Sequence, residues 1–157
     1  MEKKKFYLTK EGLSNIRKRY QELRKLRRSK IKGEVPQPFH SEEVSSEYLI
    51  FQEDLGFLED KIEKLKLILK NARLIKIPSK AERNIVNLGA EVFLETKKGQ
   101  ADKFKIVGSL EANPSLGMIS DESPLGKTLL GRRIGDEVVV QTSVKTTYRI
   151  KKIKYNS

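Results

Sequence analysis

The residues that could do chemistry in this chain are carboxylates, and they are concentrated in one segment. From Glu34 to Asp60 the sequence has eight Asp or Glu residues and neither Lys nor Arg. The chain contains no cysteine and one histidine, His40. Without cysteine there is no disulfide, thiolate zinc site or cysteine nucleophile, and a single histidine excludes every site that needs two. Any metal chemistry must therefore use carboxylate oxygens, which are ligands that suit Mg²⁺.

The net charge changes sign along the chain. The formal charge of the 157 residues is +12, but residues 1–33 carry +10, residues 34–60 carry −8 and residues 61–83 carry +6. A basic stretch by itself is as often a solvated surface as a binding site. The alternation is the feature that needs a structural explanation. Because no apolar run approaches the roughly 18 residues that cross a bilayer, and no signal-peptide core follows the N-terminus, we expect a cytoplasmic protein with no membrane association.

Apolar spacing predicts two long helices that pack as an antiparallel coiled-coil hairpin. The second helix, expected over Ser45 to Asn71, has an unbroken 3–4 spacing of apolar residues. These residues are Tyr48, Phe51, Leu55, Leu58, Ile62, Leu65, Leu69 and Ala72. The first helix is expected from the N-cap Thr9 to Lys32. Between the helices a glycine and two prolines prevent helix continuation, so the chain must turn there.

This hairpin would place the acidic segment at its tip and the basic segments on its stem. The tip candidates are Glu42, Glu43 and Glu47, and the basic stem candidates are Arg17, Lys18, Arg24, Arg27 and Arg28. For solubility alone, interspersed charges would suffice. The separation of charge therefore suggests a partner that contacts the tip and the stem in different ways.

After Pro78 the apolar period changes from 3.6 to 2, which predicts a small sheet domain. Strands are expected over residues 85–95, 103–108, 136–142 and 146–153. A short helix is expected between them, with Ser123 as N-cap, Pro124 in its first position and Gly131 after its end. The sequence thus predicts an α+β protein. Its divisions are a hairpin domain over 1–76 with a tip at about 33–47, a linker over 77–84, and a C-terminal domain over 85–157.

The sequence resembles the GreA/GreB family of bacterial transcription elongation factors along nearly its whole length. The C-terminal half carries "LGAEV" and "IVGSLEANPSLGMISDESPLGKTLLGRRIGDEVVVQT", close to the family's series of IVG, an acidic-Ala pair, G-x-IS, SPLG-x-x-LLG and GDEV. "YLTKEG" near the N-terminus and "SEYLIFQEDLGFLEDKIEKL" in the second helix also fit. These strings occur in the family's order, which makes the resemblance specific.

The resemblance implies a function as well as a fold. It implies an FKBP-like C-terminal domain that docks on RNA polymerase near the secondary channel, for which Ser123, Pro124, Leu125 and Gly126 are the docking candidates. The hairpin would insert toward the polymerase's catalytic centre, where family members present two tip carboxylates to a Mg²⁺ ion and stimulate cleavage of backtracked RNA. The protein would then be a monomeric factor rather than an enzyme, with no stably bound cofactor, and its stem would run beside nascent RNA.

The tip departs from the family pattern. The family's tip reads Gly-Asp-Leu-x-Glu-Asn-Ala-Glu-Tyr, with the Asp and the first Glu directed at the metal. Aligned backwards without gaps from Glu47 and Tyr48, that Asp falls on Ser41 and that Glu on Val44. Neither residue can hold a metal ion, so the metal-directed pair does not carry over residue by residue.

Three interpretations of the remaining tip carboxylates follow. Glu42 and Glu43 could be ordinary acidic residues in the first turn of a helix capped by Ser41. A one-residue shift could instead bring them to the metal-directed positions, and Glu43 with Glu47 would share a helix face at i, i+4. The third interpretation is a different tip contact. A lone His40 is more often a turn residue than a ligand or proton carrier.

The sequence is compatible with three functions. The first is a Gre-family factor that binds RNA polymerase and modulates elongation, either by stimulating transcript cleavage or by occupying the channel without cleavage. The second is a basic nucleic-acid-binding module with an unrelated partner. The third, an FKBP-like isomerase or chaperone, is weaker, because fold alone does not carry function and the C-terminal half has few aromatic residues.

Overall fold

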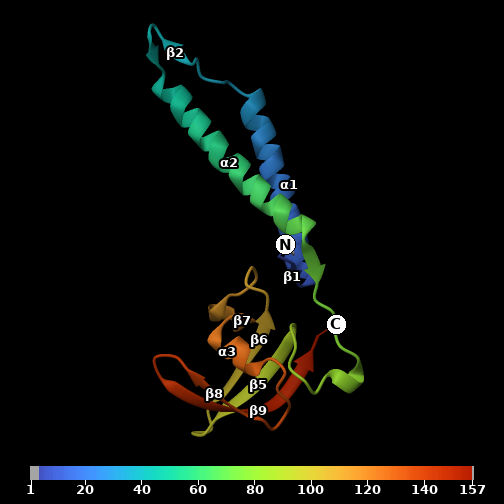
Figure 1. The fold of residues 1–157 in the computed structure, drawn as a ribbon. Helices are drawn as coiled ribbons and strands as arrows, with labels where there is room; N and C mark the ends of the chain where they lie inside the picture. Colours follow the sequence, from blue (N-terminus) through green and yellow to red (C-terminus); the bar gives the residue numbers. More distant parts are fainter. Residues whose placement is uncertain (1–3, 157) are drawn as a thin grey trace. The chain divides into compact units, whose positions relative to one another are not determined.

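The computed structural model describes residues 4–156, which form two compact units. One unit contains Glu11–Ala72, and the other contains Phe6–Lys10 together with residues 73–156. Figure 1 labels the elements of both units. The first strand of the chain, Phe6–Leu8, therefore belongs to the second unit, although it precedes the helical hairpin in the sequence. Within the described residues no helix is long and apolar enough to cross a membrane.

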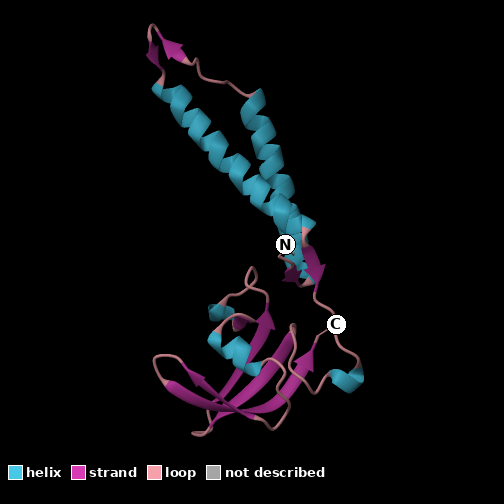
Figure 2. Cartoon of the chain, viewed as in Figure 1, coloured by secondary structure: helices cyan, strands magenta, loops and turns pink. Residues whose placement is uncertain are grey.

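The helical unit is an antiparallel hairpin with a small sheet at its tip (Figure 2). Its elements are α1 (Lys10–Lys32), β2 (Phe39–His40), β3 (Glu43–Val44) and α2 (Ser46–Lys70). Ser45 caps α2 by accepting a hydrogen bond from the backbone N–H of Tyr48, and Asn71 is the C-cap. The two helices lie within one residue of the expected ranges at each end. The strands at the tip were not expected from the sequence.

The apolar seam of the hairpin is closed along only part of its length. Leu23, Leu58 and Ile62 are buried, and Tyr20 and Leu65 pack against them. Nearer the tip the helices separate (Figure 1), and Leu26 is 56% exposed. The heptad residues Tyr48 and Phe51, for which the spacing predicts core positions, are only half-buried. The spacing of apolar residues thus predicts which residues form the apolar stripe, but not how much of that stripe is buried.

The second unit is an α+β domain built on a five-stranded mixed sheet. Its order is β7-β6-β5-β9-β8, with β6 and β7 parallel and the other neighbours antiparallel. The strands are β5 (Ala90–Thr96), β6 (Ala101–Val107), β7 (Met118–Ser120), β8 (Glu137–Gln141) and β9 (Lys145–Tyr155). The predicted fold class is confirmed. Each expected strand exists, but the one expected over residues 85–95 begins only at Ala90. β7 was missed because three residues carry too little alternation to be recognised.

The remaining elements connect and cover this sheet. β1 (Phe6–Leu8) pairs with β4 (Ala72–Leu74), and the Ile75 N–H donates to the Leu8 carbonyl oxygen at 2.9 Å. Two 3₁₀ turns cover Lys80–Glu82 and Pro114–Leu116. The helix α3 (Pro124–Leu129) lies over one face of the sheet.

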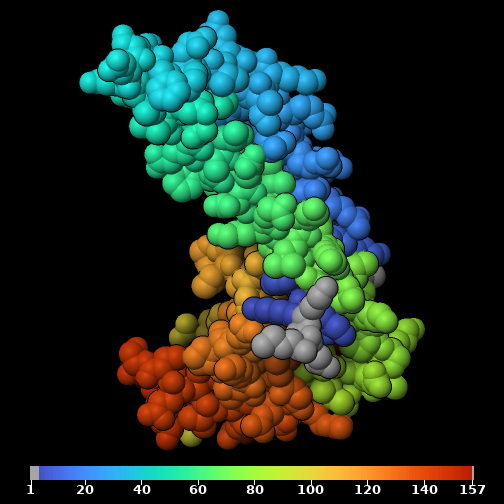
Figure 3. Space-filling model, turned by 45° about the horizontal axis from the view of Figure 1, so that its top comes forward, coloured from blue at the N-terminus to red at the C-terminus, as the bar shows by residue number. Residues whose placement is uncertain are grey.

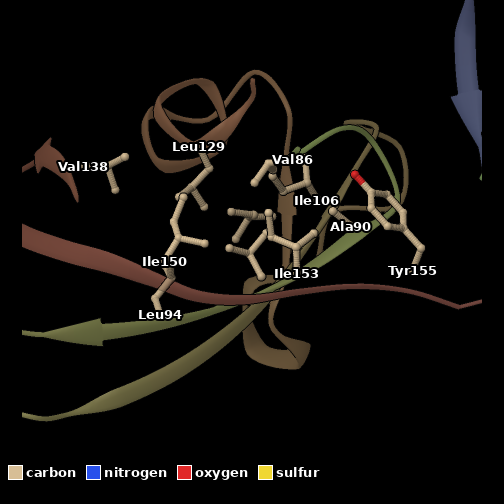
Figure 4. Close-up of a cluster of buried hydrophobic side chains, with 11 residues drawn as sticks. Val86, Ala90, Leu94, Ile106, Leu129, Val138, Ile150, Ile153 and Tyr155 are labelled. Atoms are coloured by element: carbon tan, nitrogen blue, oxygen red, sulfur yellow. The ribbon is translucent and has the colours of Figure 1, made fainter. Parts of the chain in front are cut away.

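The hydrophobic core of the second unit lies between that sheet face and α3. Leu129 of α3 lies over Ile150, and Val86, Ile106 and Ile153 surround them (Figure 4). Leu129, Ile106, Ile150 and Val86 have no exposed surface. β9 has an irregularity in its register opposite Phe93 and Leu94. An extra residue there lets Ile150 and Ile153, three apart, both face the core.

Candidate functional site

The tip of the hairpin is a two-residue turn between two short strands. Phe39 is opposite Val44, and His40 is opposite Glu43. The Ser45 N–H donates to the Pro38 carbonyl oxygen at 2.9 Å, which continues the pairing by one step. Ser41, the first turn residue, has a φ of 58°, a conformation that favours glycine. The space-filling view shows the tip side chains, in light blue and cyan, standing out from the end of the hairpin (Figure 3).

The tip hairpin overturns the helical interpretation of Glu42 and Glu43. Ser41 is not an N-cap, because α2 begins five residues later at Ser46. Glu42 occupies the turn and Glu43 lies in β3, so neither is in the first turn of a helix. The expected helix face shared by Glu43 and Glu47 does not exist. The N-cap of α2 is Ser45, which accepts from the Tyr48 N–H, so the helix begins only after the paired tip strands.

Glu47 is held at the base of the tip. The Ser45 hydroxyl donates to Glu47 Oε2 at 2.8 Å, and His40 Nε2 lies 3.3 Å from the same oxygen. Ser45 is only 2% exposed. The hydrogen bond from Ser45 is the largest of the contacts that lower the pKa of Glu47, followed by its own backbone N–H and by His40. Glu47 therefore organises the tip, and Ser45 is the residue whose role the sequence did not reveal.

All three tip glutamates are exposed, but Glu42 and Glu43 differ from Glu47 in their contacts. Neither makes a hydrogen bond or ion pair within the part of the chain that the structure describes. Residues 4–156 contain no cluster of three or more His, Asp or Glu side chains that could hold a metal ion by themselves. The two carboxylates could thus offer hard oxygen ligands only to an ion that another molecule already holds.

One face of the tip hairpin, which carries Phe39 and Val44, is apolar. Phe39 is 59% exposed and Val44 is 51% exposed, and they pair across the two strands. Phe39 is therefore exposed on this face rather than packed into the loop. An exposed aromatic ring beside a carboxylate turn can stack on a nucleic-acid base.

The stem brings three of the five predicted basic residues together. Arg24, Arg27 and Arg28 line a groove of about 500 Å³ with Tyr20. The Arg24 guanidinium lies 5.5 Å from the centre of the Tyr20 ring. Arg27 is paired with Glu59 across the hairpin at 3.0 Å. Arg17 and Lys18 are exposed but do not line this groove.

The motif from Ser123 to Gly126 is built into the fold. Ser123 is the N-cap of α3, as expected, and its hydroxyl accepts from the Gly126 N–H and donates to the Ser120 carbonyl oxygen at 2.6 Å. Gly126 is buried, and a Cβ added there would lie 2.0 Å from that same oxygen. Leu125 packs against the core. Pro124 is the exposed member of the four.

Known proteins resemble this chain along most of its length. Residues 80–155 match the family "Transcription elongation factor, GreA/GreB, C-term". A transcription elongation factor GreA of Geobacillus kaustophilus is 36% identical over 142 residues, which are 88% of this chain and 89% of the relative. The chain belongs to the GreA/GreB family of transcription elongation factors. A second GreA, from Thermomicrobium roseum, is 34% identical and covers 90% of this chain and 92% of its own length.

Among solved structures, the Gre factor resembles the GreA factor homolog 1 of Thermus thermophilus. The identity is 27%, with a TM-score of 0.43 and coverage of 96% of this chain and 99% of the other. The family assignment rests on the sequence relatives. It confirms the predicted family and the predicted role as a transcription elongation factor, and the unrelated nucleic-acid module and the isomerase are not supported by any of these relatives.

Proposed function

We propose that this Gre factor binds bacterial RNA polymerase in the cytoplasm as a monomer, and that its hairpin enters the secondary channel. The observation that carries the proposal is the charge separation on one hairpin, with free carboxylates at the tip and clustered arginines on the stem. A partner with a cationic or metal-bearing centre and anionic walls or RNA around it would complement both parts.

At the tip, Glu42 and Glu43 are the residues proposed to act. A Mg²⁺ ion held by the polymerase would supply charge stabilisation for the oxygens of a phosphodiester under hydrolysis. Carboxylate oxygens fit that ion's preference for hard ligands. Glu47 is set apart from this role because its carboxylate, although exposed, already accepts a hydrogen bond from the Ser45 hydroxyl and lies beside His40. In this proposal Glu47 fixes the geometry, and Glu42 and Glu43 reach outward to stimulate cleavage of backtracked RNA.

A second mechanism is occupation of the channel without cleavage. It is favoured by the positions of the two carboxylates, since Glu42 lies in the turn and Glu43 in a strand. Adjacent residues of an extended chain point to opposite sides, so the two need not converge on one ion. The same hairpin would then block the channel through its length and charge alone.

A transcript cleavage assay separates these mechanisms. Backtracked elongation complexes with labelled RNA receive Mg²⁺ and the factor, and RNA length is followed with time. The proposal expects shortened RNA with the parent chain, and loss of shortening with Glu42→Gln/Glu43→Gln. Glu34→Gln is the matched control, because Glu34 is exposed in the same acidic segment but outside the tip strands.

The two mechanisms give opposite results in this assay. Binding without shortening, together with competition against a cleavage-active Gre factor, would establish channel occupation and overturn the cleavage role. Shortening that survives the double substitution would remove Glu42 and Glu43 from the mechanism. Failure of the polymerase to bind at all would overturn the entire proposal.

Docking is proposed for the surface at the start of α3. Ser123, Leu125 and Gly126 are committed to the fold, so Pro124 is the part of the motif that can meet a partner. Pro124→Glu should weaken capture of the factor by immobilised polymerase, because it changes the exposed residue of the motif. The variant should still fold, since the first turn of a helix tolerates a carboxylate. Val144→Glu, at a side chain that is 68% exposed in the β8–β9 turn, is the control and should leave capture unchanged.

The arginines of the stem are proposed to run beside RNA. Arg24 and Arg28 have no carboxylate partner among the described residues, whereas Arg27 has Glu59. Their contribution should fall as salt is raised, since it comes from phosphate neutralisation. Arg17 and Lys18 would add charge from outside the groove.

A further inference from the structure

The outer face of the five-stranded sheet, opposite α3 and the core, has an unusual centre. Along β5 the side chains alternate, so Val92 and Leu94 are buried while Glu91, Phe93 and Glu95 face outward. Phe93 is therefore a large aromatic residue in the middle of the exposed sheet face rather than in the core. It lies on β5, the central strand of the sheet.

Lysines flank Phe93 on both neighbouring strands. Phe93 is in register with Lys103 of β6 and with Lys152 of β9. Their ammonium groups lie 5.9 Å and 5.5 Å from the centre of the Phe93 ring. One step along the sheet, Glu91 is in register with Lys105 and Lys154 in the same way. Four lysines thus frame one aromatic ring and one carboxylate.

Only some of the charged side chains on this face form ion pairs. Arg149 is paired with Glu137 at 2.7 Å, and Lys151 is paired with Glu95 at 3.5 Å. Glu91 instead accepts a hydrogen bond from the Asn156 side chain at 3.1 Å.

The four framing lysines, by contrast, make no ion pair within the described residues. These lysines are Lys103, Lys105, Lys152 and Lys154. Four cations without an ion pair are therefore gathered around Phe93 and Glu91, and Arg149 and Lys151, which are paired, lie farther along β9.

We propose that this face, called here the Phe93 platform, binds single-stranded nucleic acid. The platform consists of Phe93 with the four framing lysines. A base stacks on the Phe93 ring after Lys103 and Lys152 move from the ring to the phosphates on either side. Basic grooves with aromatic rings bind single strands in this way, with little sequence preference. The negative charge of Glu91 repels the phosphates and limits the affinity.

Charge and shape favour a nucleic acid over an acidic protein at this face. Removing the lysines from the ring exposes a flat apolar surface of the size of one base, flanked by cations on both sides. An acidic protein would use the lysines but would leave the ring without a planar partner. The site is separate from the stem groove, since every residue in it belongs to the second unit. It does not depend on the function proposed for the tip.

Binding is tested with the full chain in a background that removes the stem contribution, Arg24→Gln/Arg27→Gln/Arg28→Gln. The probe is a fluorescein-labelled oligoadenylate of about ten nucleotides, within the site sizes of single-strand binding folds. A second probe has the same backbone without bases. Fluorescence anisotropy gives the dissociation constant of each probe at several salt concentrations.

The ring and the lysines should affect different quantities. Phe93→Leu should weaken oligoadenylate binding about fivefold or more, as expected for loss of one stacked base, and should leave the abasic probe unaffected. Phe93→Tyr keeps the ring and should bind like its parent. Lys103→Gln/Lys152→Gln should weaken both probes and reduce the slope of log K against log salt by about 1.4.

A matched control removes the same charge elsewhere in the unit. Lys98→Gln/Lys145→Gln neutralises two exposed lysines outside the platform and should change the slope far less. Equal effects of the two lysine pairs would overturn the proposal, because binding would then depend on net charge alone. Equal binding of oligoadenylate and the abasic probe by the parent, or an unchanged affinity in a folded Phe93→Leu variant, would also overturn it.

Discussion

Replacing Gly126 with alanine would place a methyl group against the backbone of β7. The added Cβ would lie 2.0 Å from the Ser120 carbonyl oxygen and 3.0 Å from Ser123 Oγ. Favourable contacts between carbon and a carbonyl oxygen are found at roughly 3.3–3.6 Å. The first turn of α3 would therefore have to move away from β7 by about 1.3 Å or more. The Ser120 oxygen belongs to the backbone, so the movement involves backbone.

The cost of that movement can be estimated from the contacts it disturbs. Forcing an extra carbon into a packed site costs about 1–3 kcal/mol. The two hydrogen bonds of the Ser123 hydroxyl, at 2.6 Å and 3.1 Å, are worth about 1 kcal/mol each. The gain in helix propensity from glycine to alanine offsets about 1 kcal/mol. Gly126→Ala should therefore destabilise the second unit by about 2–4 kcal/mol.

Urea unfolding, followed through NMR methyl signals of Ile150 and Leu129, measures the second unit separately from the hairpin. Gly56→Ala is the control of opposite sign. Gly56 lies inside α2, and nothing would be within 4 Å of its added Cβ. That substitution should stabilise the hairpin by about 0.5–1 kcal/mol. A Gly126→Ala variant whose second unit unfolds within about 0.5 kcal/mol of the parent, the usual range of surface substitutions, would refute the steric reasoning.

Three further predictions concern single hydrogen bonds and one turn. Ser45→Ala should destabilise α2 by about 1 kcal/mol through loss of its cap, and it should raise the pKa of Glu47 in an NMR titration. Because the pKa of Glu47 is lowered from 4.5 in the fold, its stabilising effect is present above that pH and is lost as pH falls through the lowered value, a loss that Ser45→Ala should diminish. Ser41→Gly should stabilise the tip by up to about 1 kcal/mol, seen as slower amide exchange in β2 and β3. Tyr155→Phe should cost the second unit about 1–2 kcal/mol in urea unfolding, since the Tyr155 hydroxyl accepts from the Asn87 N–H at 2.9 Å and donates to the Ile85 carbonyl oxygen.

Repeated local patterns made most of the fold predictable from the sequence. The 3–4 spacing from Tyr48 onward predicts α2, and the capping pattern of Ser123 and Pro124 predicts α3. These signals are local and repeat over many residues, or use side chains with one strong preference. The closed and open parts of the hairpin seam were not predictable, because Leu23 and Leu26 are both apolar and only the separation of the helices distinguishes them.

The candidate site was less predictable, because its geometry depends on pairing between neighbours. A two-residue strand has no periodicity of its own, so β2 and β3 left no pattern in the sequence. The positive φ of Ser41 gave no signal either, since glycine is the residue that marks such a turn. The closure by Ser45 and Pro38 became visible only in three dimensions.

The tip strands change which carboxylates are available for chemistry. In a helix that began at Ser41, all three glutamates would point outward near a helix N-terminus. The strands instead move the helix start to Ser46, where Ser45 and His40 hold the carboxylate of Glu47. That leaves Glu42, in the turn, and Glu43, in β3, as the tip carboxylates without a partner among the described residues. The pairing of the two tip strands, rather than the number of acidic residues, therefore determines where Glu42 and Glu43 lie.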